Sequence, residues 1–233
     1  MKFYTFEIFK LRKLVIPIAI LTFVSQLFIT YFFAVIGQFE DTVGDQLLKS
    51  YSVVVGLAST ITMCVVSIYG STRISRYIVK DYIGDNRNRV FLYPIKRSQL
   101  YFIKNRTFGF ILGFTQVLFL LLANIFFLIG ETLFPIMEKP LANHWINLIF
   151  SILACALITL SIIFFSSLVG IYFSSTINTV VASIISVVVM ANILALALIN
   201  FQFSAFIGAL SILLVALLML SNTGKQIDKT EVF

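Results

Sequence analysis

The stretch TVVASIISVVVMANILALALINFQFSAFIGALSILLVALLML, residues 179–220, decides the fold class of this chain. It contains no Asp, Glu, Lys or Arg. A helix needs about 20 mostly apolar residues to cross a bilayer, so this stretch is long enough for two crossings. We expect spans at 179–198 and 202–220, joined as a tight hairpin near Asn200. One long helix followed by a re-entrant piece is the alternative arrangement.

Four further windows of the same kind precede this stretch, at 14–36, 51–70, 107–130 and 145–173. The whole chain of 233 residues is 60% hydrophobic, has a mean hydropathy of +1.02, and is only 12% charged. A soluble domain has about 25% charged residues. The sequence therefore predicts an all-α integral membrane protein with six transmembrane helices, built as a single transmembrane domain over 1–233.

The distribution of positive charge predicts the orientation of these spans. Fifteen of the 17 Lys and Arg residues lie before the first span, between the second and third spans, or after the sixth. The opposite side has only Lys49 and Lys139. Cytoplasmic segments carry the excess of Lys and Arg, so we expect both termini in the cytoplasm of a protein of the cell membrane. The net charge of +7 is then mostly a matter of topology and gives little support for nucleic-acid binding.

Residues that would support catalysis are scarce. The chain has one histidine, His144, and no carboxylate inside any of the six windows. General acid–base chemistry and metal binding both need such groups close together, so we expect neither an enzyme nor a metal site. Lys225 follows Gly224, but Gln226 stands where a P-loop needs Ser or Thr. Cys64 and Cys155 lie inside spans and are interpreted as packing thiols.

The segment 71–106 is the one sizeable loop, and its pattern predicts a folded elbow. Ile74, Tyr77, Ile78 and Tyr82 have helical spacing, which indicates an amphipathic continuation of the second span. Turn residues follow at 84–86. A short helix at 87–93 should end before Pro94, because proline disfavours helical backbone in the preceding residue.

Two pairs of small residues predict close helix contacts. Gly109 and Gly113 are four residues apart in the third span, and Ser166 and Gly170 are four apart in the fourth. Small residues at this spacing allow helices to approach closely in membranes. The contacts could be made inside one chain or across a dimer.

The elbow resembles that of small bacterial permeases of the type-2 ABC exporter family, which have six spans. The similarity rests on Asp81, Gly84, the run Leu92-Tyr93-Pro94-Ile95-Lys96-Arg97, and Lys104. The chain departs from the family pattern in having Asp81 rather than Glu, and Lys96 where Ser is usual before the Arg.

This resemblance implies the transmembrane subunit of an exporter. It implies a second permease copy or paralogue, and separate ATPase subunits that bind the ATP and Mg. The short helix at 87–93 would be the coupling helix that docks on the ATPase. The docking residues would be Arg87, Arg89, Val90, Phe91, Leu92, Tyr93 and Pro94.

The cargo expected of such an uncharged bundle is hydrophobic or amphipathic, a lipid, peptide or drug. The resemblance also suggests export of antimicrobial peptides or immunity to them. Two other classes of function fit the same composition. One is a stand-alone carrier or channel. The other is a membrane scaffold whose basic elbow binds anionic lipid through its charges, at about 1 kcal/mol per residue near the surface.

Overall fold

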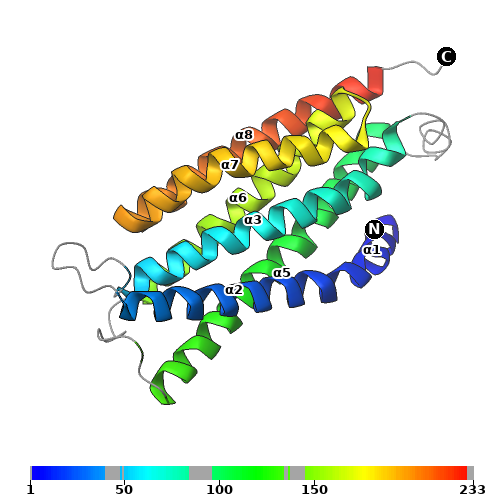
Figure 1. The fold of residues 1–233 in the computed structure, drawn as a ribbon. Helices are drawn as coiled ribbons and strands as arrows, with labels where there is room; N and C mark the ends of the chain where they lie inside the picture. The colour runs from blue at the N-terminus through cyan, green and yellow to red at the C-terminus, as the bar shows by residue number, and fades with distance from the viewer. Residues whose placement is uncertain are drawn as a thin grey trace.

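The structure, a computed structural model, describes residues 2–39, 48, 50–83, 96–133, 136 and 145–229. Every element of secondary structure in these residues is helical, and six of the helices are long enough and apolar enough to cross a membrane. The prediction of six spanning helices is confirmed to that extent. The long helices (Figure 1) are α2 (Val15–Gln38), α3 (Tyr51–Tyr77), α5 (Arg97–Leu133), α6 (Trp145–Tyr172), α7 (Thr176–Asn200) and α8 (Gln202–Lys229).

Three short elements complete the described chain. They are α1 (Lys2–Leu11), the 3-10 turn η1 (Arg12–Leu14) and the 3-10 turn η3 (Val79–Tyr82). α1 leads through η1 into α2, and Figure 1 shows it bent away from the line of α2. η3 follows α3 directly, so the helical continuation expected after the second apolar window is present.

Several helices are longer than the apolar windows that predict them. α3 continues past Gly70 to Tyr77, α5 begins at Arg97 rather than near Thr107, and α8 continues past Leu220. Helical hydrogen bonds do not require apolar side chains, so a helix can continue after hydropathy falls. The extensions carry charged residues, among them Arg76 and Lys225, which can lie outside the apolar layer.

The hairpin expected near Asn200 is present. α7 ends at Asn200 and α8 begins at Gln202, so Phe201 alone joins them. Its backbone, at φ −146° and ψ 84°, leaves the helical region. Its N–H still donates to the Ala197 carbonyl at 2.8 Å, and its carbonyl accepts from Ala205 N–H at 3.0 Å. Both helices are full spans by length, so the alternative with a re-entrant piece is wrong.

α6 is the central helix of the bundle. It packs against α3, α5, α7 and α8, whereas α2 packs against α3 and α5. α7 and α8 lie along one side of the bundle (Figure 1), and many of their large apolar side chains are exposed. Large exposed residues on these two helices include Ile185, Val188, Leu196, Leu214 and Leu218. An apolar surface of this size suits contact with lipid.

Both ends of the chain lie at one end of the bundle, together with η3 and the start of α5 (Figure 1). We call this the basic end, because the described Lys and Arg side chains belong to it. These residues are Lys10, Arg12, Lys13, Arg73, Arg76, Lys80, Lys96, Arg97, Lys104, Arg106 and Lys225. The clustering follows the charge pattern on which the cytoplasmic placement is predicted.

Candidate functional site

The candidate site is the base of the elbow, where α3 and η3 lead into the segment 84–95 and α5 leads out of it. Ile74 and Ile78 are fully buried and Tyr82 is nearly so, at helical spacing along one face. This face anchors the end of α3 to the bundle. Ile83 then has extended backbone, with φ −119° and ψ 139°, so the helical path ends there.

An ion pair joins the two sides of this base. Lys104 Nζ on α5 lies 2.5 Å from Asp81 Oδ2 on η3. The Lys104 side chain is 7% exposed and that of Asp81 is 32% exposed. A nearly buried ammonium is costly to desolvate without a partner, so this pair fixes η3 against α5. The resemblance named both residues, but their contact was not expected from the sequence.

An acid on α1 adds to this charged group. Glu7 is 3% exposed and lies within electrostatic range of Lys104, Lys10 and Asp81. One of its carboxylate oxygens, Oε2, has no hydrogen-bond partner among the described residues. Two acids and two lysines, from three separate elements, therefore share the basic end of the bundle. We refer to Glu7, Lys10, Asp81 and Lys104 as the charged cluster.

Glu7 was missed in the sequence, although one signal for it was present. It is placed four residues before Leu11, which is 2% exposed and part of the core. Residues four apart lie on the same face of a helix, so an acid at position 7 had to face inward with Leu11. The N-terminal residues looked like a surface helix, and no partner for a buried acid could be read from the sequence.

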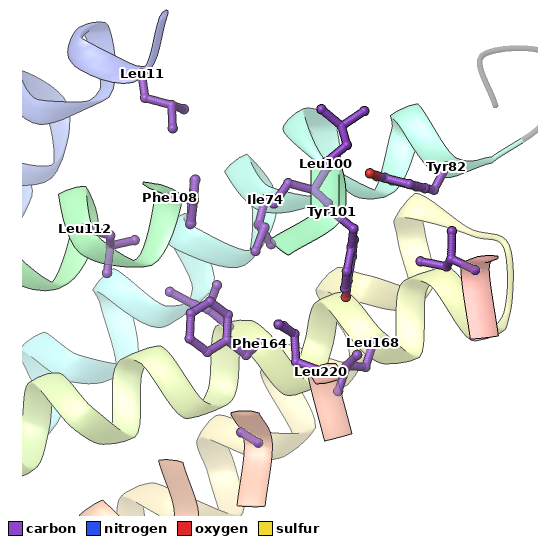
Figure 2. Close-up of a cluster of buried hydrophobic side chains, with 14 of the residues drawn as sticks. Leu11, Ile74, Tyr82, Leu100, Tyr101, Phe108, Leu112, Phe164, Leu168 and Leu220 are labelled. Atoms are coloured by element: carbon purple, nitrogen blue, oxygen red, sulfur yellow. The ribbon is translucent and has the colours of Figure 1, made fainter. Parts of the chain in front are cut away.

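Aromatic side chains surround the charged cluster. Lys10 Nζ lies 4.9 Å from the centroid of the Tyr77 ring, and Lys104 Nζ lies 5.7 Å from it. Both distances lie within the range of cation–π attraction. The Tyr82 ring meets that of Tyr101 edge to face at 5.4 Å between centroids. Figure 2 shows these two rings among the apolar side chains of the same core.

This packing makes the base of the elbow a rigid part of the bundle. Leu100 and Tyr101 on α5 are fully buried and belong to one core with Ile74, Phe164 and Leu220 (Figure 2). The core draws on α1, α2, α3, η3, α5, α6 and α8. A force applied to the elbow would therefore reach most of the bundle.

The proposed docking residues lie outside the described part of the chain. They are Arg87, Arg89, Val90, Phe91, Leu92, Tyr93 and Pro94, and Gly84 of the elbow motif belongs with them. Arg97 begins α5 and is half-buried. Of the motif residues that the structure describes, Asp81 and Lys104 are thus brought together.

The small residues predicted for helix packing face neighbours inside the chain. A Cβ atom at Gly109 would lie 2.6 Å from Phe164 Cζ of α6, and one at Gly113 would lie 3.1 Å from Leu160 Cδ1 of α6. These two glycines therefore let α5 approach α6 closely.

The second small-residue pair lies on α6. The hydroxyl of Ser166 lies 3.0 Å from that of Ser71 on α3, within hydrogen-bond distance. A Cβ atom at Gly170 would meet Thr179 Oγ1 of α7 and would lie 3.1 Å from Val79 Cγ1 of η3. The end of α6 thus contacts the start of the elbow.

A buried polar network joins three helices within the apolar layer. Gln26 on α2 is fully buried; its amide nitrogen donates to Ser59 Oγ and to Asn124 Oδ1, both at 3.2 Å. Its amide oxygen accepts from Thr62 Oγ1 at 2.9 Å. Asn124 and Thr62 are polar residues inside apolar windows of the sequence, and so is Gln26. A glutamine near the middle of the first window was the available signal.

The described residues form neither a metal-binding cluster nor a disulfide. Among the described residues there is no cluster of three or more His, Cys, Asp or Glu that could hold a metal ion. Cys64 and Cys155 are free thiols within spanning helices. Comparison with protein-family models, with curated proteins and with solved structures finds no match.

Proposed function

We propose that this chain is the membrane-spanning subunit of an ATP-driven exporter in the cell membrane. A separate ATPase subunit, which binds ATP and Mg, docks on the short helix at 87–93. A second permease copy or paralogue completes the transport path. The cargo is hydrophobic or amphipathic, in keeping with the uncharged bundle, and moves outward. The proposed biological role is export of an antimicrobial peptide or immunity to one.

The ion pair between Asp81 and Lys104 is the observation that carries this proposal. It joins the two flanks of the segment 84–95, in addition to the apolar core that Tyr82, Leu100 and Tyr101 share. A docking segment that transmits a conformational change from a partner subunit needs a rigid base. A loop that only binds anionic lipid through its charges has no need of a buried lysine paired across its base.

The test is co-purification and reconstitution of this chain with an ABC ATPase subunit. The double substitution Val90→Asp and Phe91→Asp should abolish co-purification of the ATPase and ATP-driven transport, while membrane insertion is unchanged. Apolar anchors at the centre of an interface carry most of its binding energy, so two acids there should be decisive.

A matched control uses two exposed apolar residues at the basic end that lie outside the segment 87–93. Tyr172 and Phe173, at the end of α6, are 83% and 59% exposed. The double change Tyr172→Asp and Phe173→Asp should leave ATPase binding intact. Equal loss in both variants would contradict docking at 87–93. Transport by this chain alone in liposomes would overturn the exporter proposal in favour of a stand-alone carrier or channel.

A further inference from the structure

We propose that a groove at the basic end binds an anionic glycerophospholipid with hydroxyl groups in its head group. The groove has a volume of about 850 Å³ and lies between α1, α5, α6 and α8. Binding sites for small ligands are commonly about 300–1,000 Å³. This inference needs no ATPase partner, so it stands or falls separately from the proposed function.

The apolar part of the groove suits an acyl chain. Leu213, Leu217 and Leu220 line it from α8, and Phe164 lines it from α6. Two turns of a helix separate Leu213 from Leu220, which is about 10 Å along the axis. Gly109 also lines the groove beside Phe164, where its lack of a side chain lets α5 lie close to α6. The groove is therefore an elongated apolar channel that runs inward from the basic end.

The polar residues of the groove lie together on consecutive positions of α5. Arg106 lines the groove and is exposed. Asn105, also in the lining, is only 1% exposed, and its amide nitrogen donates to the Tyr101 carbonyl at 3.0 Å. Its amide oxygen has no hydrogen-bond partner among the described residues. An unpaired buried acceptor is unfavourable, so a ligand that supplies a donor should be favoured there.

These features together select the ligand. The guanidinium of Arg106 can pair with a phosphate, and Asn105 Oδ1 can accept a hydrogen bond from a hydroxyl. The leucines of α8 can pack against a hydrocarbon chain. A phospholipid such as phosphatidylglycerol has all three parts, with the phosphate between the hydroxyls of the head group and the acyl chains. The groove also opens at the basic end, where surrounding Lys and Arg residues attract anionic lipid.

The experiment places a fluorescent reporter at the groove. Trp145 is the one tryptophan of the chain and lies at the start of α6, at the opposite end of the bundle. In a Trp145→Phe background, Phe110→Trp introduces a reporter at a lining residue that is 62% exposed. The full chain is reconstituted in vesicles that contain brominated phosphatidylglycerol, phosphatidylmethanol or phosphatidylcholine with identical chains. Bromine quenches tryptophan on contact.

Phosphatidylmethanol, which has the charge but no hydroxyl, should quench with about fivefold higher relative affinity than phosphatidylcholine, which corresponds to about 1 kcal/mol for one cation at the surface. Phosphatidylglycerol, which has both the charge and the hydroxyl groups, should exceed phosphatidylmethanol. Arg106→Gln should remove the preference for anionic lipid. Arg76→Gln is the matched control, because Arg76 is exposed at the same end but does not line the groove, and it should keep the preference.

Three results would overturn all or part of the inference. Equal quenching by all three lipids would show that the groove holds ordinary boundary lipid. If the preference for anionic lipid falls equally in Arg106→Gln and Arg76→Gln, that preference comes from the summed positive charge of the basic end and not from the groove. Equal quenching by phosphatidylglycerol and phosphatidylmethanol would remove the role given to Asn105. Inorganic phosphate added at the same concentration should not compete, since the hydrocarbon chain is part of the recognition.

Discussion

Loss of the Asp81 carboxylate should destabilise the chain more than loss of its lysine partner. At the observed separation of 2.5 Å, Coulomb attraction is about 7 kcal/mol at an effective dielectric constant of about 20, and about 2 kcal/mol at about 80. Asp81 is 32% exposed, so water screens it, and desolvation of Lys104 offsets part of the gain. We expect a net coupling of about 1–3 kcal/mol.

The order of the two single substitutions follows from burial. Asp81→Asn leaves Lys104 charged and 7% exposed without its closest carboxylate, which should cost about 2–3 kcal/mol. Lys104→Met replaces a buried charge by an apolar chain of similar length and leaves Asp81 partly solvated, so its cost should be smaller. In the Lys104→Met background, Asp81→Asn should become nearly neutral.

The assay is a double-mutant cycle on the free energy of unfolding. The four proteins are unfolded by titration with sodium dodecyl sulfate in mixed micelles, and helix content is followed by circular dichroism. Effects that add within about 0.5 kcal/mol indicate independent sites. If Asp81→Asn costs the same with and without Lys104, the ion pair contributes nothing, and the reasoning about the base of the elbow fails.

Three further predictions test the bundle and its orientation. Gln26→Leu removes three interhelical hydrogen bonds and should cost about 2 kcal/mol, at about 0.6 kcal/mol for each bond in a membrane; an unchanged unfolding curve would refute a structural role for the network. Gly109→Val should cost about 1–3 kcal/mol through overpacking against α6, whereas Gly208→Val, where a Cβ atom would meet nothing within 4 Å, should cost much less in the same titration; equal costs would contradict the close approach. Lys225→Cys should react with a membrane-impermeant thiol reagent from the cytoplasmic side, and Thr132→Cys from the outer side; reaction of both from one side would contradict the predicted orientation.

Hydropathy was sufficient to predict the spans, because an uncharged stretch about 20 residues long has few stable places outside a bilayer. Hydropathy did not predict where α3 and α8 end or where α5 begins. The charged extensions of α3, α5 and α8 are held by packing, as Tyr82 against Tyr101 illustrates. Such packing depends on which helices become neighbours, and the pattern within one helix does not contain that information.

The same limit explains what was missed at the candidate site. Asp81 and Lys104 were recognisable one by one, but their pairing required the crossing of η3 and α5. Glu7 and Gln26 became noticeable only when their surroundings showed that they were buried. The predicted docking residues at 87–94 lie outside the described residues, so that hypothesis rests on the sequence alone.

The length of α5 has a mechanical consequence. Its 37 residues form one uninterrupted helix of about 55 Å, at about 1.5 Å per residue, whereas the hydrocarbon layer is about 30 Å thick. We therefore expect the portion of α5 around Lys104 to extend beyond that layer. Because α5 is uninterrupted, a lateral force on this portion would tilt the whole helix.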